Sequence, residues 1–368
     1  MTTPLTRFRF LNICLTAGTL LIVPSKAAVL QEEFIFDKAP YAQCHASTLV
    51  ETPDGLVAAW FGGTRERDPD VGIWLSRQEH GRWTVPKEVL NGVQYRRSDG
   101  TESRYGTWNP VLFQSREGPL LLFYKEGPNA QSWWGLMVTS HDHGRTWSEP
   151  RRLPRGIFGP IKNKPIQLEN GDILCPSSYE TTENPSNWSV HFERTRDLGR
   201  TWERTYPVND GVALNAIQPS LLRLGGDRLL AIGRTRQGHL FQVESGDLGK
   251  TWGPMSLGTL PNPNSGTDAL TLKDGRHLLI YNHTAREPGK YGGKRSPIHL
   301  AVSRDGYTWQ AALLLEKTPG ELSYPAIIQT ADGKVHITYT WLRQRIKHVV
   351  IDPDQLKPRD FVNGQWPE

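Results

Sequence analysis

One eight-residue motif recurs along the 368-residue chain and limits the folds that the chain can adopt. Three copies fit S/T-x-D-x-G-x-T-W, a fourth is one residue shorter, and a fifth has lost the Asp; they span 140–147, 195–202, 245–252, 303–309 and 76–83. Asp and Gly in D-x-G suit a turn in which the carboxylate accepts backbone N–H bonds and Gly supplies a positive φ. We therefore interpret the repeated Asp as structural, and we expect the Trp to pack between repeats.

A second unit, a turn glycine followed by a hydrophobic strand, has the same period. It occurs six times, at Gly55, Gly118, Gly171, Gly226, Gly275 and Gly333. Repeats of roughly 50 residues built from short strands are typical of propeller blades, four-stranded sheets that stack on their neighbours. The sequence thus predicts an all-β, six-bladed β-propeller with Asp-box turns. Residues 29–39 are expected to add a strand to the last blade and close the ring.

The N-terminus has the pattern of an export signal. Arg7 and Arg9 precede an apolar stretch over 11–23, and Ser25-Lys26-Ala27 reads as a small-x-small cleavage site. We expect residues 1–28 to be a signal peptide, residues 29–368 to be a single propeller domain, and the protein to be exported to the periplasm or the extracellular space. No later apolar run approaches the roughly 18 residues of a membrane-spanning helix.

Charge and cysteine content exclude several classes of partner. The signal peptide carries three cations and no acid, so its removal lowers the formal net charge from +5 to +2. No dense Lys/Arg patch remains, so nucleic acid is not an expected partner. Cys44 and Cys175 are the cysteines of the mature chain, and their pairing cannot be read from the sequence. No Cys/His cluster has zinc-ligand spacing, so we expect neither metal nor cofactor, and we expect a monomer.

The repeats, with the residues between them, resemble the sialidase (neuraminidase) superfamily over residues 30–355, in particular exported proteins with the Asp-box repeat, also named the BNR repeat. The resemblance implies arginines that grip a substrate carboxylate, an Asp acid/base and a Tyr nucleophile. Asp70 lies where the family has its acid/base, Tyr324 matches the nucleophile, and Arg295 matches the third arginine. Arg234 or Arg236 matches the second. A neutral Tyr suits this reaction, because a carboxylate nucleophile would be repelled by the carboxylate of the substrate.

Two positions depart from the family pattern. His45 stands where the family has its first arginine, and Gln218 stands where the Glu that activates the nucleophile is expected. Gln218 cannot accept a proton, so strict sialidase activity is not expected. His45 has either a structural role or, as an acid or base suited to neutral pH, a catalytic one.

Further polar residues fall in segments rich in Pro and Gly, where binding sites concentrate. Lys162, Asn264 and Asp268 are predicted to contact substrate, and Arg65 to help the other arginines hold the carboxylate. Each of these residues could equally be an ordinary turn residue.

Three functions follow from this set of residues. The first is an exo-acting glycoside hydrolase that removes a terminal sialic, ulosonic or uronic acid from a glycan. The second is a lyase or a uronate-linkage-cleaving propeller that uses His45 or Tyr324 as its base, and the third is a carbohydrate-binding propeller without catalysis. An acidic glycan or oligosaccharide is the expected partner in the first two cases.

Overall fold

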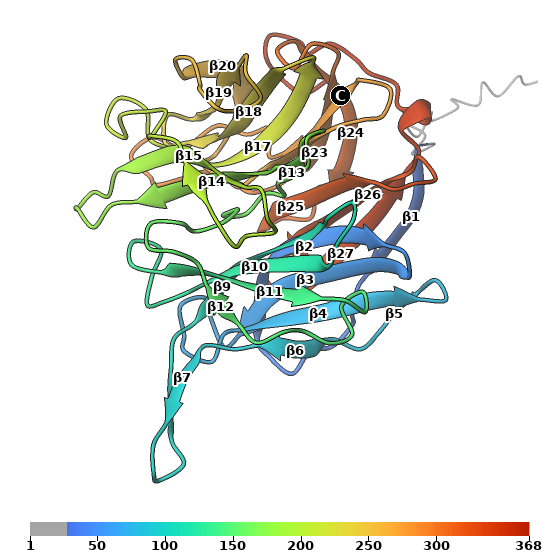
Figure 1. Cartoon of the computed structure of the whole chain (residues 1–368). Helices are drawn as coiled ribbons and strands as arrows, with labels where there is room; N and C mark the ends of the chain where they lie inside the picture. The colour runs from blue at the N-terminus through green and yellow to red at the C-terminus, as the bar shows by residue number, and fades with distance from the viewer. Residues whose placement is uncertain (1–27, 368) are drawn as a thin grey trace, which may run out of the picture.

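The computed structural model describes residues 28–367, in which six antiparallel sheets are arranged around a common centre (Figure 1). The prediction of a six-bladed propeller is confirmed. The predicted signal peptide, apart from Ala28, lies outside the described residues. Within residues 28–367, no helix has the length and apolar character that crossing a membrane requires.

The blades follow one another along the chain. Blade 1 contains β2 (Gln43–Thr52), β3 (Gly55–Gly63), β4 (Gly72–Glu79), β5 (Arg82–Trp83) and β6 (Lys87–Leu90). Blade 2 contains β9 (Thr107–Gln114), β10 (Leu120–Glu126), β11 (Trp134–Ser140) and β12 (Arg151–Arg152). Blade 3 contains β13 (Ile166–Gln167), β14 (Ile173–Glu180), β15 (Trp188–Thr195) and β16 (Glu203–Arg204). Blade 4 contains β17 (Ala216–Gly225), β18 (Arg228–Thr235), β19 (His239–Ser245) and β20 (Ser256–Pro261). Blade 5 contains β21 (Asp268–Thr271), β22 (His277–Tyr281), β23 (Ile298–Ser303) and β24 (Trp309–Glu316). Blade 6 contains β25 (Leu322–Gln329), β26 (Val335–Trp341), β27 (Arg345–Ile351) and β1 (Val29–Phe34). Outside the blades lie the hairpin of β7 (Val93–Arg96) and β8 (Glu102–Arg104), which projects from the ring in Figure 1, and the short helix η1 (Pro353–Gln355).

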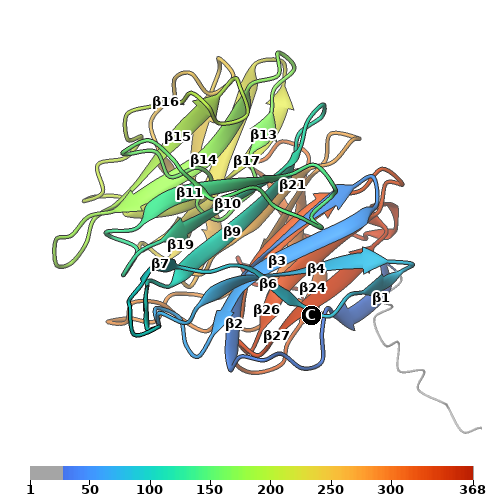
Figure 2. The same ribbon diagram turned by 60° about the horizontal axis from the view of Figure 1, so that its bottom comes forward.

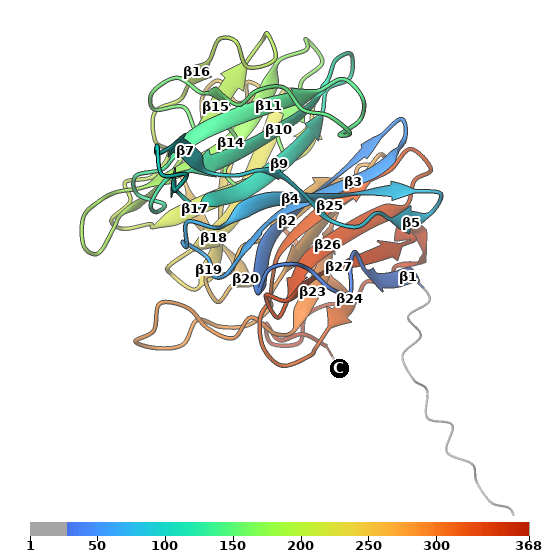
Figure 3. The same cartoon turned by 90° about the horizontal axis from the view of Figure 1, so that it is seen from below.

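The ring is closed by the N-terminal strand. β1 pairs antiparallel with β27, with Phe34 opposite Lys347, as predicted. β2 of the first blade packs against β25 and β26 of the last, and Figures 2 and 3 show these blue and red strands side by side. The second strand of each blade begins at or within two residues after the predicted turn glycine. These strands are buried on both faces, because each sheet packs between two others.

The Asp-boxes are turns between the third and fourth strands of their blades. Asp142 accepts hydrogen bonds from the backbone N–H (2.8 Å) and the hydroxyl (2.6 Å) of Thr146, while Gly144 has a φ of +87°. The Trp252 ring stacks on Phe192 of the neighbouring blade at 3.7 Å between centroids. The structural interpretation of the repeated Asp and Trp is confirmed.

Strand direction gives the propeller two distinct faces. Because neighbouring strands are antiparallel, the start of each first strand, the end of each second strand and the loop that follows it share one face, here named the site face. The tight turns after the first strands and the Asp-boxes share the opposite face, the Asp-box face. His45, Gln218 and Tyr324 all lie near the start of a first strand, so the topology brings them to the site face.

Candidate functional site

Bulges in the first strands present the central side chains. The strand registers shift between His45 and Thr48, between Ile217 and Ser220, and between Ser323 and Ala326. Within these bulges Gln218 and Tyr324 adopt φ values of +57° and +52°. A positive φ is costly for residues with large side chains, and such strain concentrates at functional sites. A bulge re-aims the side chain that it carries.

Tyr324 is the hub of the site. Its buried hydroxyl oxygen accepts a hydrogen bond from Arg234 Nη2 at 2.9 Å, and Gln218 Nε2 lies 3.5 Å away. The guanidinium of Arg295 lies 6.0 Å from the centre of the Tyr324 ring, and the ammonium of Lys162 lies 5.8 Å from it. The Tyr324 side chain is therefore surrounded by cations that come from three different blades or the segments that lead into them.

Arg234 stays cationic although it is buried. Burial opposes its charge, but the interactions with Tyr324, Tyr291 and Glu180 outweigh burial and raise its pKa. Arg234 Nη1 also donates to the backbone oxygen of Asn264 at 3.2 Å. The residue belongs to β18 itself, one position before the end of that strand.

A network of carboxylates and guanidinium groups lies beside Tyr324. Glu321 accepts hydrogen bonds from Arg295 Nη1 and from Arg343 Nε, each at 2.8 Å, and Arg343 Nη1 donates to Glu66 at 2.7 Å. Burial raises the pKa of Glu321, but His45, Arg295 and Arg343 lower it below its usual range. Because burial keeps His45 neutral, the two guanidinium groups are the charges that keep Glu321 ionised.

His45 packs directly against the nucleophile candidate. Its ring centroid lies 4.1 Å from that of Tyr324, its Nδ1 lies 3.0 Å from Thr340 Oγ1, and its Nε2 lies 3.8 Å from Glu321. Burial and the positive charge of Arg343 lower the pKa of His45 well below its usual value, and the attraction of Glu321 offsets only part of this. His45 is thus a neutral imidazole, and the nearby Glu321 carboxylate is the group that favours its protonation.

Lys162 ties several blades together at the centre. Its ammonium donates to Asn163 Oδ1 and to the backbone oxygen of Thr267, both at 2.8 Å, and to the backbone oxygen of Pro325. Burial lowers the pKa of Lys162 to about 7. Three donors meet three acceptors, so the protonated form fits this place.

Other predicted residues lie at the margin or within the scaffold. Arg236 donates to the backbone oxygen of Ser186 at 2.6 Å and stacks over Trp188 at 4.0 Å, next to Arg234. Asp268 is buried, and its carboxylate accepts hydrogen bonds from Lys164 at 2.9 Å and from Ser220 at 3.0 Å. Asn264 contributes its backbone to the site, as described above.

Asp70 and Arg65 lie in the loop between β3 and β4, on the site face. Asp70 Oδ2 accepts hydrogen bonds from the backbone N–H and the hydroxyl of Thr64, both at 2.8 Å. Arg65 is 72% exposed and pairs with Asp68 at 3.2 Å. Among the described residues, no hydrogen bond or ion pair joins the Asp70 carboxylate or Arg65 to Tyr324, but Glu66 of the same loop reaches Arg343. The acid role of Asp70 stays a prediction.

Glu321 was not predicted as a site residue, whereas Glu66 and Arg343 belong to polar clusters at strand ends, which the sequence allows either to line the central face or to be ordinary turn residues. Glu66 and Arg343 are 277 positions apart in sequence, so their ion pair depends on ring closure. Chain position was the sequence signal for Arg343: it follows the second strand of blade 6, just as Asp70 follows the second strand of blade 1. Cys44 and Cys175 are both buried and unpaired.

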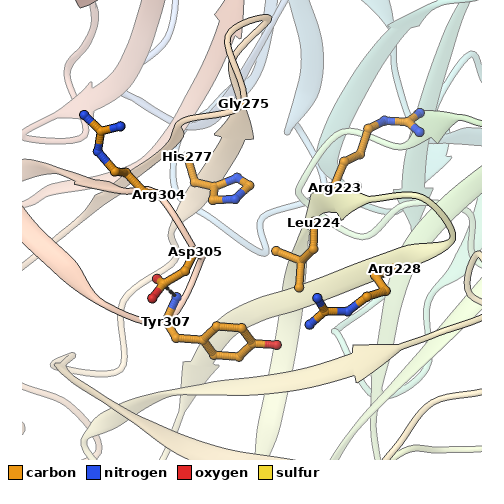
Figure 4. Close-up of a pocket in the computed structure, with 9 residues that line it drawn as sticks. Arg223, Leu224, Arg228, Gly275, His277, Arg304, Asp305 and Tyr307 are labelled. Carbon is orange, nitrogen blue, oxygen red and sulfur yellow. Dashed lines mark hydrogen bonds between the residues drawn. The ribbon is translucent and has the colours of Figure 1, made fainter.

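The Asp-box face carries a separate pocket between blades 4 and 5. Figure 4 shows Arg223, Arg228 and Arg304 around it, with His277 and Tyr307 from blade 5. Asp305 at its edge is held by its own turn, where it accepts a hydrogen bond from the backbone N–H of Tyr307 at 2.8 Å. This pocket shares none of its lining residues with the central network.

A six-bladed ring with Asp-box turns and these central residues on one face defines the sialidase-like class of propellers. Residues 54–337 match the model of the BNR repeat-like domain, and the chain belongs to this family. A comparison with curated proteins found no match.

Solved structures share the fold at low sequence identity. A Dyadobacter fermentans protein of unknown function is 19% identical, with a TM-score of 0.72 and coverage of 88% of this chain and 98% of that chain. The Hadza microbial sialidase Hz136 is 19% identical with a TM-score of 0.67, and the match covers 86% of this chain and 66% of that one. NanB sialidase of Streptococcus pneumoniae is 12% identical with a TM-score of 0.67, covering 88% of this chain and 71% of that one. At these identities, the likeness shows the fold alone.

Proposed function

We propose that the protein is an exo-acting glycoside hydrolase that removes a terminal acidic sugar, of the sialic, ulosonic or uronic type, from a glycan. The observation that carries the proposal is the environment of Tyr324. The residue lies in a bulge with a positive φ, and its hydroxyl oxygen accepts a hydrogen bond from the buried Arg234 at 2.9 Å. Three buried polar atoms nearby have no hydrogen-bond partner among the described residues, namely Gln218 Oε1, Arg234 Nε and Asn264 Oδ1. Buried polar groups are normally paired, so these atoms are suited to bind a ligand.

The cations explain a preference for an acidic sugar. Arg234 and Arg295 bind the substrate carboxylate through paired N–H groups, which match the two oxygens of a carboxylate. Tyr324 then attacks the anomeric carbon without the repulsion that a carboxylate nucleophile would meet. Arg234 also donates to the developing phenolate, and this favours the charged oxygen over the neutral one.

Protons move through two residues in this mechanism. As the Tyr324 oxygen forms its bond to the anomeric carbon, the neutral ring of His45 takes the phenolic proton, which Gln218 cannot accept. The bond to the leaving-group oxygen breaks at the same time, and Asp70 protonates that oxygen. Water then cleaves the bond between the sugar and Tyr324, with Asp70 taking its proton and His45 returning its own to Tyr324.

Release of free sugar from sialyl and uronyl glycosides tests this proposal. Asp70→Asn should lower the rate about 100-fold or more, because general acid catalysis contributes at least that much. Asp37→Asn, the same substitution at an exposed acid between β1 and β2, is the control, and it should retain the wild-type rate. If Asp70→Asn cleaves as fast as the wild type, the acid assignment is wrong; if the wild type binds acidic glycans and cleaves none, the chain is a binding propeller.

The neutral imidazole also supports a lyase as a second candidate. In that reaction the arginines neutralise a uronate carboxylate, and His45 removes the adjacent C–H proton while the bond to the leaving oxygen breaks. β-Elimination leaves an unsaturated uronate that absorbs in the ultraviolet, whereas hydrolysis does not. An absorbance assay on uronate polysaccharides, with His45→Gln as the variant, therefore separates the two chemistries.

We further propose that the protein acts after export and as a monomer. The apolar stretch over residues 11–23 and the small residues before position 28 support export. Sequencing of the N-terminus of the mature protein, combined with size-exclusion chromatography with light scattering, tests both expectations.

A further inference from the structure

The pocket on the Asp-box face, between blades 4 and 5, has a volume of about 450 Å³ (Figure 4). Proteins bind small ligands in pockets of roughly 300–1,000 Å³, so this volume is sufficient for a sugar ring. The rings of His277 and Tyr307 and the side chain of Leu224 surround its interior, and the guanidinium of Arg228 points towards Tyr307. The interior therefore combines apolar surface with hydrogen-bond donors.

One carboxylate fixes both Arg228 and Tyr307. Glu244 on β19 accepts a hydrogen bond from Arg228 Nε at 2.8 Å and another from the Tyr307 hydroxyl. This bridge joins blade 4 to the Asp-box turn of blade 5 and holds the Tyr307 ring as a wall of the pocket. The Arg228 side chain is 54% exposed, so its guanidinium is oriented by Glu244 and still open to a ligand.

His277 presents a hydrogen-bond donor to the pocket. The side chain is buried, and burial lowers its pKa although Asp305 attracts a proton, so the ring is neutral. Thr271 Oγ1 accepts the backbone N–H of Arg223 at 2.9 Å and lies 3.0 Å from His277 Nδ1. We assign the hydroxyl hydrogen of Thr271 to Nδ1, which leaves the ring proton on Nε2. Among the described residues Nε2 has no hydrogen-bond partner, so its N–H can donate to a ligand oxygen.

Two arginines extend the positive charge to either side of the pocket. The side chains of Arg304 and Arg223 point to opposite sides in Figure 4. Arg223 Nη2 donates to the backbone oxygen of Gln167 at 2.6 Å, and the exposed Arg304 makes no hydrogen bond or ion pair within residues 28–367. Asp305, the one acid among the described lining residues, is bound by backbone N–H groups of its own turn. The cations are thus spread across the pocket and do not converge on one point.

We propose that this pocket is a binding site for an acidic polysaccharide, separate from the central network around Tyr324. A sugar ring packs between Tyr307 and Leu224, and its carboxylate or sulfate group is bound by Arg228 and His277. The two outer arginines attract the acidic groups of neighbouring sugars. A spread of cations favours a chain with repeated charges over a single small anion, which converging donors would suit better. The site does not depend on the proposed function.

Calorimetric titration with defined tetrasaccharides tests this site without relying on turnover. Tetragalacturonic acid is the carboxylated probe, a κ-carrageenan tetrasaccharide is the sulfated probe, and maltotetraose is the neutral control. The wild type should bind at least one acidic probe more tightly than maltotetraose, and the tighter probe identifies the acidic group. Arg228→Gln should weaken this binding about tenfold, the loss of a charge-assisted pair, and Arg304→Gln about threefold, the loss of an exposed charge.

Two further variants serve as controls. Arg82→Gln changes an exposed arginine that lies in the blade 1 copy of the Asp-box and outside the pocket lining, and it should bind the probes as the wild type does. Arg234→Gln removes a cation of the central network and should keep the binding at the pocket. Thermal unfolding of all variants verifies that the ring is intact.

Three results would overturn the inference: acidic probes that bind no more tightly than maltotetraose, equal affinities in Arg228→Gln and the wild type, or loss of all acidic binding in Arg234→Gln. Binding that depends on Arg228, in a protein that cleaves no acidic glycoside, overturns the proposed function and leaves this site standing.

Discussion

Replacing Lys162 with methionine tests how the blades are held together beneath the site. The substitution keeps the length of the side chain and removes the ammonium, so the oxygens of Asn163, Thr267 and Pro325 lose their donor. Each buried acceptor left without a partner costs about 1–3 kcal/mol. We therefore expect Lys162→Met to unfold more easily than the wild type.

The size of the effect depends on pH in a definite direction. Burial lowers the pKa of Lys162 in the folded protein from 10.5 to about 7, although Asp268 attracts the charge. Between these two values the unfolded chain binds more protons than the folded one, so the stability of the wild type rises with pH by up to about 1.4 kcal/mol per unit. Lys162→Met lacks this contribution, and its deficit should be about 3 kcal/mol larger at pH 9 than at pH 6.

Chemical denaturation followed by tryptophan fluorescence at pH 6, 7.5 and 9 measures this difference. Lys125 is also buried with a pKa lowered to about 7, but it is present in both proteins and cancels. Lys357→Met, a change at an exposed lysine, is the control. A deficit that stays constant between pH 6 and 9, or shrinks, would refute the placement of a buried, titrating ammonium at the centre of the ring.

Three further variants separate scaffold from site. Asp197→Ala removes the acceptor of the Thr201 N–H and hydroxyl bonds, at 2.7 and 2.6 Å. It should lower the free energy of unfolding by about 1 kcal/mol with unchanged kcat, as calorimetry and an activity assay can check. Arg234→Lys replaces the planar guanidinium beside Tyr324 with an ammonium, and it should lower kcat/KM about 100-fold with little change in Tm. An unchanged kcat/KM would contradict the role of Arg234 in binding the carboxylate and stabilising the Tyr324 oxygen. Gln218→Glu places a proton acceptor near the Tyr324 hydroxyl and should raise kcat about tenfold; a slower variant would show that Gln218 is needed as a donor.

The fold could be predicted because the sequence patterns that specify it are short and local. The Asp-box is a self-contained turn, and each hydrophobic strand follows its own turn glycine, so six units could be counted without knowing any long-range contact. Closure by a strand within residues 29–39 was also predicted, since a ring of blades leaves no exposed edge once its last sheet is completed, and β1 supplies that strand.

The site could be predicted only in part, because its contacts run between blades. His45, Gln218 and Tyr324 were found through positions matched to the family, and the structure brings them together. The pairing of Arg343 with Glu66 and Glu321 depends on a left-handed turn, which the sequence does not reveal, and on the contact that this turn makes between the last blade and the first. Bulge geometry likewise decides which side chains face the centre, and alternation along a strand cannot reveal it.

The most direct test of the central claim compares an acidic glycoside with its carboxyl methyl ester as substrates for the wild type and for Tyr324→Phe. The variant keeps the ring that packs on His45 and removes only the oxygen that Arg234 contacts. The account predicts that the wild type releases free sugar from the acid and not from the ester, and that Tyr324→Phe is at least about 100-fold slower on the acid. Equal rates for Tyr324→Phe and the wild type, or equal cleavage of acid and ester, would contradict it.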